Sequence, residues 1–145
     1  MTNLFESATV LSLPIFKSQH WIYAFADFQN KTLVFCDSYY NSASQVVSEA
    51  NVTFGPWILN ALQFEYSKRL QNGVQEAHFD QNEWKTIDIS VTKQKDGDNC
   101  GLFIILFMYR IMKNVANDKP LEVNKSTVLN DAKFRIIRNT LVDIC

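Results

Sequence analysis

The 145-residue sequence has little glycine, little proline and no excess of charge of either sign. Four Gly and three Pro are too few for a linker or a low-complexity chain, and 47% hydrophobic residues are too many for intrinsic disorder. The net charge of −1 argues against a nucleic-acid partner that is bound through its phosphates. We therefore expect residues 1–145 to form a single domain, because a chain of this length can bury a real core without disulfides.

The cysteines and histidines do not form a metal-binding pattern. The three cysteines, Cys36, Cys100 and Cys145, are an odd number at scattered spacings, without a C-x-x-C pair. Only His20 and His78 are available beside them, so no zinc-binding spacing can be assembled. We expect neither a metal nor a cofactor.

Signals for export and for membrane insertion are also missing. No Lys or Arg precedes Lys17, so the N-terminus lacks the basic region of a signal peptide. The longest apolar stretch, Leu102–Tyr109, is far shorter than the roughly 18 residues that span a bilayer. These absences favour an intracellular location, in nucleus or cytoplasm, without a membrane partner.

Strand-like segments dominate the first third of the chain. Residues 9–16 resemble an extended segment interrupted by Pro14, and the aromatic run Trp21–Phe28 precedes the β-branched run Thr32–Asp37. The polar residues between these two runs favour an antiparallel hairpin. A further strand is predicted over Lys85–Val91, where apolar and polar residues alternate.

The remaining segments favour helices. Pro56 suits a first helical position and Gly73 suits a stop, with apolar residues at helical spacing between them. That predicted apolar face comprises Trp57, Ile58, Ala61, Leu62, Phe64 and Leu70. From Cys100 onward the sequence is apolar almost all round, which predicts a central buried helix. A closing amphipathic helix is predicted from about Asn130, and the whole order indicates an α+β fold.

Three residues stand out by their positions between these elements. His20 begins the first strand of the hairpin and Asp37 ends the second, so the hairpin would bring them side by side. Cys100 begins the buried helix, where the helix N-terminus and an imidazolium would lower the pKa of the thiol from about 8.5. The arrangement suits a thiolate nucleophile, with His20 as the proton carrier and Asp37 orienting the imidazole.

Gln94 precedes Cys100 by six residues and offers an amide for an oxyanion. Each residue also has an ordinary structural explanation: a strand-end histidine is commonly structural, and a helix-starting cysteine is commonly a small buried hydrophobe. Cys36 alternates with Asp37 along the strand, so we expect it to face the other way and to be structural. His78 with Asp80 is an alternative dyad in a less suitable position.

The combined pattern resembles the ubiquitin-like-protein-specific (SUMO/sentrin) cysteine protease family. Two blocks carry the resemblance, PIFKSQHWIYAFADFQNKTLVFCDSYY and KQKDGDNCGLFIILFMYRI. The motif pairs within them are His20-Trp21, Asp37-Ser38 and Gln94 followed by Cys100-Gly101. The resemblance implies a papain-like (adenain-like) α+β fold, with a small mixed or antiparallel sheet flanked by helices and a central buried helix after the nucleophile.

The resemblance also implies an activity and roles for the residues. The family cleaves after the C-terminal Gly-Gly of a SUMO-like modifier, in deconjugation or precursor maturation. Carried over to this sequence, His20 is the base, Asp37 its orienting partner, Cys100 the nucleophile and Gln94 the oxyanion donor. Trp21 corresponds to one wall of the channel that holds the diglycine. The implied partners are the modifier, SUMO foremost, and its conjugates.

Three alternatives stay open at this point. Only 19 residues precede His20, so we expect a catalytic domain incomplete at its N-terminus. Such a domain would be either an active thiol protease or a weak or inactive module that binds a modifier or partner without turnover. An acyltransferase on the same His-acid-Cys scaffold is a third class, although no basic cluster suggests a coenzyme A pocket.

Overall fold

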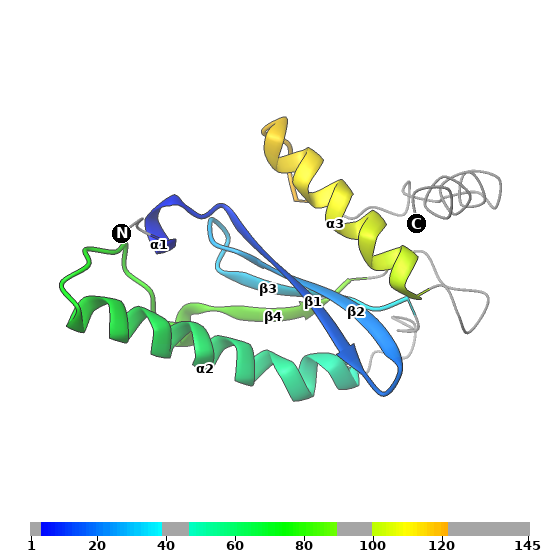
Figure 1. The fold of residues 1–145 in the computed structure, drawn as a ribbon, viewed down its shortest axis with the longest axis horizontal. Helices are drawn as coiled ribbons and strands as arrows, with labels where there is room; N and C mark the ends of the chain where they lie inside the picture. The colour runs from blue at the N-terminus through cyan, green and yellow to red at the C-terminus, as the bar shows by residue number, and fades with distance from the viewer. Residues whose placement is uncertain (1–3, 39–46, 90–99, 122–145) are drawn as a thin grey trace.

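The computed structural model describes residues 4–38, 47–89 and 100–121 (Figure 1). Its centre is a four-stranded sheet in the order β1-β2-β3-β4. The strands are β1 (Val10–Lys17), β2 (His20–Asp27), β3 (Thr32–Cys36) and β4 (Lys85–Asp88). The pairs β1–β2 and β2–β3 are antiparallel, whereas β3–β4 is parallel, so the sheet is mixed as expected.

Two long helices cover opposite faces of this sheet. They are α2 (Glu49–Gln71) and α3 (Cys100–Ala116), which lie below and above the strands in Figure 1. A short helix, α1 (Leu4–Ser7), precedes β1, and a single 3-10 turn, Gln81–Glu83, precedes β4. The result is the α+β arrangement that the order of segments predicts.

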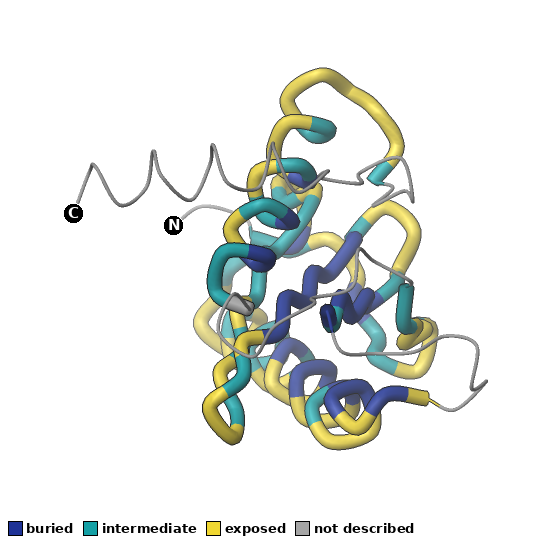
Figure 2. The backbone as a smooth tube through the Cα atoms, turned by 90° about the vertical axis from the view of Figure 1, so that its right-hand side faces the viewer, coloured by how far each residue is buried: buried dark blue, intermediate teal, exposed yellow. Residues whose placement is uncertain are grey.

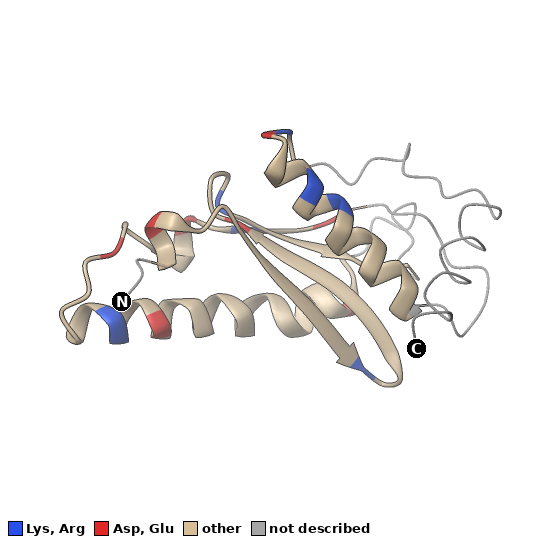
Figure 3. Cartoon of the chain, turned by 45° about the horizontal axis from the view of Figure 1, so that its top comes forward, with Lys and Arg blue, Asp and Glu red and all other residues tan. Residues whose placement is uncertain are grey.

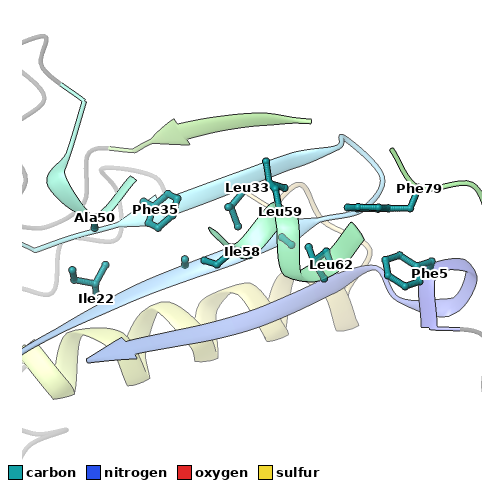
Figure 4. Packing of buried hydrophobic residues seen from close by; sticks show 11 residues of the cluster. Phe5, Ile22, Leu33, Phe35, Ala50, Ile58, Leu59, Leu62 and Phe79 are labelled. Carbon is teal, nitrogen blue, oxygen red and sulfur yellow. The ribbon is translucent and has the colours of Figure 1, made fainter. Parts of the chain in front are cut away.

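Alternation along β2 divides the core into two layers. Ile22 and Ala24 face α2 and belong to the cluster drawn in Figure 4. Tyr23 and Phe25 face the other way and pack with the buried side of α3. Because every second residue of a strand points to the same face, the two layers share the central strands, which are the most buried segments in Figure 2.

The predicted hairpin is confirmed. Strands β2 and β3 match the predicted runs closely, and the turn between them is closed by Asp27, whose carboxylate accepts from the backbone N–H and the side-chain amide of Asn30 at 3.0 and 2.8 Å. The segment with Pro14 is a full strand at the edge of the sheet, with Pro14 exposed. An edge strand tolerates proline, because only one side of it must donate to a neighbour.

The predicted start of the first long helix is wrong. Helix α2 begins at Glu49, seven residues before Pro56, which lies inside the helix. Ser48 caps it by accepting from the backbone N–H of Asn51 at 3.0 Å. Asp88 at the end of β4 accepts from the Ser48 backbone N–H at 2.9 Å, so the sheet fixes where the helix starts. The predicted stop is confirmed, because Asn72 caps the helix and Gly73 follows with φ of 76°.

The predicted apolar face of this helix is only partly right. Trp57 and Phe64 are 67% and 71% exposed, and Ala61 and Leu70 are exposed beside them. The buried apolar side chains of the predicted segment are those of Ile58, Leu59 and Leu62. The stripe that begins at Trp57 is as regular as the buried one, so spacing alone does not distinguish the side that meets the sheet.

Helix α3 forms where predicted, and the sheet covers one side of it. Phe103, Phe107 and Ile111 are buried against β2 and β3, whereas Tyr109 and Met112 are exposed on the far side. The closing helix predicted from about Asn130 lies outside the described residues.

Among the described helices, none has the length and apolar character that crossing a bilayer demands. Charged residues of both signs are scattered over the described part of the chain (Figure 3).

Candidate active site

His20 and Asp37 form a hydrogen-bonded pair at one end of the hairpin. His20 is the first residue of β2, and Asp37 directly follows Cys36, the last residue of β3. His20 Nε2 donates to Asp37 Oδ1 at 2.7 Å, and the two side chains are only 16% and 14% exposed. The antiparallel hairpin therefore brings together two residues that are 17 apart in sequence. Partial burial strengthens such a charge-assisted hydrogen bond and holds the imidazole in one orientation.

The pair lines a cavity of about 170 Å³ on the α2 side of the sheet. Lys17, which lies opposite His20 in the β1–β2 ladder, and Glu49 from the first turn of α2 also line it. Lys17 Nζ lies 2.7 Å from Glu49 Oε1, and this hydrogen bond lowers the pKa of the Glu49 carboxyl. The ion pair connects the hairpin tip to the start of α2.

Trp21 points to the opposite face of the sheet, where α3 begins. A Cβ added to Gly101, the second residue of α3, would lie 3.7 Å from Trp21 Cδ1, an ordinary contact distance. Cys100, the first residue of this helix, therefore begins it at the His20-Trp21 end of β2. The helix then runs away from that end, and Asp118 after its C-terminus lines a cavity with Asp27, the last residue of β2.

Phe16 is a neighbour of this site that the sequence analysis did not single out. It lies directly opposite Trp21 in the β1–β2 ladder, and the two ring centroids are 4.8 Å apart. The signal was available in the sequence, because a two-residue turn at Ser18-Gln19 pairs Phe16 with Trp21. Pro14 obscures this signal, because a proline makes the first segment resemble an interrupted strand.

Cys36 is structural, as its alternation with Asp37 predicts. Its side chain is fully buried in the layer beneath α3, whereas Asp37 lines the cavity on the α2 side. Burial, reinforced by the nearby carboxylate of Asp88, raises the pKa of the Cys36 thiol well above its ordinary value. A neutral, inaccessible thiol cannot act as a nucleophile.

Three predicted features lie outside the description. The structure describes neither Gln94 nor Cys145, and it describes Cys100 only as the first backbone position of α3. The oxyanion role of Gln94 and the nucleophilic role of Cys100 therefore stay predictions.

The alternative dyad of His78 and Asp80 is exposed and differently arranged. His78 Nε2 lies 3.6 Å from Glu83 Oε1, while Asp80 Oδ1 accepts from the backbone N–H of Asn82 at 2.9 Å. Ligand atoms of His78, Asp80 and Glu83 lie within 4.8 Å of one another, as in a metal-binding group. The ammonium of Lys31 also pairs with Glu83, however, and would compete with a cation there.

Comparisons with known proteins identify the family of this chain. Residues 1–141 match the model of the Ulp1 protease family, C-terminal catalytic domain. A de-sumoylating protease has a similar structure, with a TM-score of 0.55 and 19% identity over 80% of this chain and 42% of its own. A SUMO protease Ulp1, with its catalytic cysteine oxidized to a sulfenic acid, gives a TM-score of 0.50 and 20% identity, covering 81% of this chain and 46% of its own.

The chain thus spans less than half the length of these two structures, and at such identities the likeness shows the fold alone. No curated protein matches the sequence. The family match covers nearly the whole chain. The chain belongs to the Ulp1 protease family.

Proposed function

We propose that this protein is a thiol protease that cleaves after the C-terminal Gly-Gly of a SUMO-like modifier, in conjugates or in the precursor. The observation that carries the proposal is the 2.7 Å hydrogen bond between His20 and Asp37, at the end of β2 where Trp21 lies near the first turn of α3. The similarity to a SUMO protease and a de-sumoylating protease supports the choice of modifier.

The proposed chemistry follows from the hydrogen bond at His20 Nε2 and from the position of Cys100 at the start of α3. Asp37 engages Nε2 of His20, so Nδ1 is the nitrogen that takes the thiol proton. The Cys100 thiolate, favoured by the helix N-terminus, attacks the carbonyl carbon of the last glycine. The protonated imidazole then gives its proton to the departing lysine or peptide amine, and water hydrolyses the thioester. Gln94 is the proposed donor to the oxyanion.

Alternation along β2 limits where the thiol of Cys100 and the imidazole of His20 can meet. His20 and Asp37 line a cavity on the α2 side, whereas Trp21 faces the α3 side, near Gly101 at the start of that helix. The sheet separates these two faces. In this proposal the thiol of Cys100 therefore approaches the imidazole of His20 around the end of β2, where the chain turns at Ser18-Gln19. The proposal therefore requires the thiol of Cys100 to project beyond the sheet.

The test is labelling by a SUMO whose C-terminal Gly-Gly carries an electrophile. We expect wild-type protein to be labelled at Cys100 and Cys100→Ser to remain unlabelled. His20→Ala and Asp37→Asn should be labelled about a hundredfold more slowly, the lower end of the range for acid–base groups. His78→Ala is the matched control, because His78 is exposed and does not line the cavity that holds His20 and Asp37. Dibromoacetone, which bridges a thiol and an imidazole in contact, should link Cys100 to His20.

The outcomes separate the candidate functions. Folded protein that is not labelled by SUMO, NEDD8 or ubiquitin probes would contradict the protease proposal. Binding of SUMO without labelling, together with an unreactive Cys100 thiol at about pH 6, would favour the non-catalytic binding module instead.

A further inference from the structure

The carboxylate of Asp88 joins the end of β4 to the start of α2. Its Oδ2 accepts from the Ser48 backbone N–H at 2.9 Å and from the Asn51 side-chain amide at 3.1 Å. Its Oδ1 accepts from the Ser48 hydroxyl, which in turn accepts from the Asn51 backbone N–H at 3.0 Å. Ser48 and Asn51 are 6% and 4% exposed, so water has little access to these hydrogen bonds. We call these three residues the Asp88 network.

The helix turn that this network holds forms one wall of the cavity around the His20–Asp37 pair. Glu49 and Ala50 are the first two residues of α2, and both line that cavity. Ala50 is only 3% exposed and belongs to the same buried cluster as Ile22, a further lining residue of the cavity (Figure 4). Because the Asp88 network fixes the first turn of α2, it also fixes this wall.

The register of the sheet brings the network close to Asp37. Asp88 lies directly opposite Phe35 in the parallel β3–β4 ladder, and Asp37 follows Phe35 by two residues. Side chains two residues apart on a strand point to the same face, and here that face is the one that α2 covers. The carboxylate that anchors α2 and the carboxylate that binds His20 therefore lie at the ends of adjacent strands, on the same side of the sheet.

We propose that Asp88 is a positioning residue for the His20–Asp37 pair, which it keeps oriented and shielded from water through the first turn of α2. The inference rests on the proposed function, in which His20 takes the thiol proton of Cys100. A partly buried, charge-assisted hydrogen bond is stronger and better oriented than one that is open to water. Without the network the helix loses its N-cap, its first turn opens more often, and the imidazole loses its fixed orientation.

Loss of the network should lower kcat and leave KM nearly unchanged. Trp21, the proposed contact of the glycines, lies on the α3 face near Gly101, whereas the network lies on the α2 face. Loosening the network therefore displaces the proton carrier and leaves the proposed substrate contact at Trp21 in place. A displacement of about 1 Å in a catalytic group can cost roughly a hundredfold in rate. For a loosened helix turn we expect about a tenfold loss.

The experiment compares Asp88→Asn with Asp80→Asn. Asp80 also caps a helical turn, and its Oδ1 accepts from the backbone N–H and the side-chain amide of Asn82, both at 2.9 Å, but this turn precedes β4. With a fluorogenic SUMO amide at the glycine pair, Asp88→Asn should lower kcat about tenfold, while KM changes less than twofold. Asp80→Asn should resemble wild type.

Two further variants separate positioning from a loss of stability. Ser48→Ala removes a donor of the same network, so it should also lower kcat about tenfold. The double variant Ser48→Ala/Asp88→Asn should stay within about twofold of the more affected single variant, because both changes break one connection. Leu62→Ala removes a buried side chain in the middle of α2 and should keep the wild-type kcat well below its unfolding temperature. If Asp88→Asn fails to fold, Ser48→Ala against Leu62→Ala provides the same test.

Proton exchange at His20 Nε2 provides a readout that needs no turnover. In nuclear magnetic resonance spectra, the proton that His20 donates to Asp37 should exchange with water about tenfold faster in Asp88→Asn and Ser48→Ala than in wild type. Exchange in Asp80→Asn should match wild type, because that cap lies at the opposite end of β4.

Each contrary result has a distinct meaning. An active wild-type enzyme in which Asp88→Asn has the kcat of Asp80→Asn would overturn the inference and leave the proposed function intact. An equal loss of kcat in Leu62→Ala, or additive losses in the double variant, would overturn it as well, because Asp88 would then act through stability or through its charge. If no modifier probe labels Cys100 of the wild type, the proposed function fails, and proton exchange at His20 alone then decides whether Asp88 shields the pair.

Discussion

At the scale of single residues, adjacent positions on one strand have opposite roles. Cys36 and Asp37 are consecutive, yet the first is sealed beneath α3 and the second holds His20. The same division separates His20 from Trp21 on the neighbouring strand. Because successive side chains of a strand point to opposite faces, Cys36 is structural while its neighbour Asp37 belongs to the candidate site. This assignment could be predicted from the sequence.

Cys36 should make the protein sensitive to alkaline pH. Its folded-state pKa is raised by burial, so the unfolded chain releases this proton first and stability falls as pH rises above the ordinary thiol pKa of about 8.5. The slope should approach roughly 1.4 kcal/mol per pH unit. Tyr23, whose pKa burial raises to about 12, should add a second loss above about pH 10.

Urea unfolding between pH 7 and pH 10 measures this effect. Cys36→Ala should abolish the slope below pH 10, at a constant cost for the missing sulfur. An equally steep loss in Cys36→Ala would show that another group causes it.

The turn before His20 holds two residues in a conformation they disfavour. Ser18 and Gln19 have φ of 51° and 61° in a two-residue turn, which is the backbone that Asn-Gly adopts readily. Replacing them by Asn and Gly together should stabilise the protein by roughly 1 kcal/mol, measured by the urea midpoint. Gln29→Gly, in the next turn but without a positive φ, is the control and should not stabilise.

At the scale of elements, the strands were more predictable than the helices. Strand β2 is a continuous aromatic run with a polar turn after it, so local sequence defines both of its ends. The start of α2 depends on Asp88, which is 40 residues from Ser48 and holds that cap through the sheet. No pattern within the helix itself reports such a distant hydrogen bond, so the sequence predicts a start near Pro56 instead.

The two possible starts of α2 predict different mutant stabilities. Ser48→Ala should cost roughly 1–2 kcal/mol, because it removes the N-cap and a hydroxyl that donates to Asp88. Pro56→Ala should stabilise by about 1–2 kcal/mol, because it restores a helical N–H and outweighs the greater freedom of the unfolded chain. Thermal or urea unfolding checks both. A destabilising Pro56→Ala with a neutral Ser48→Ala would instead place the start at Pro56.

At the scale of the whole molecule, the sheet separates the two parts of the candidate site. Sequence predicted that His20 would meet Asp37, because a hairpin joins their strands. It did not predict that the pair lies on the α2 face while Phe16 and Trp21 lie on the α3 face. That division depends on which helix covers which face, and amphipathic spacing does not encode it, as the exposed stripe of α2 illustrates.

The shared sheet should make the two layers unfold together. Leu62 is buried on the α2 side and Phe107 on the α3 side, but both layers are built on alternate residues of β2 and β3. Loss of packing on either face therefore loosens strands that the other layer requires. Leu62→Ala should cost about 2–5 kcal/mol and Phe107→Ala about 3–5 kcal/mol, large fractions of the 5–15 kcal/mol typical of a domain.

Urea unfolding followed by tryptophan fluorescence and by far-ultraviolet circular dichroism provides the measurement. In both variants the two signals should shift together and remain coincident, as a two-state transition requires. Phe64→Ala should change stability by less than about 0.5 kcal/mol, because that side chain is exposed. If Leu62→Ala moved only one signal, α2 would be an independently melting layer, and the hydrogen bond between His20 and Asp37 would then survive the loss of the helix that covers its side of the sheet.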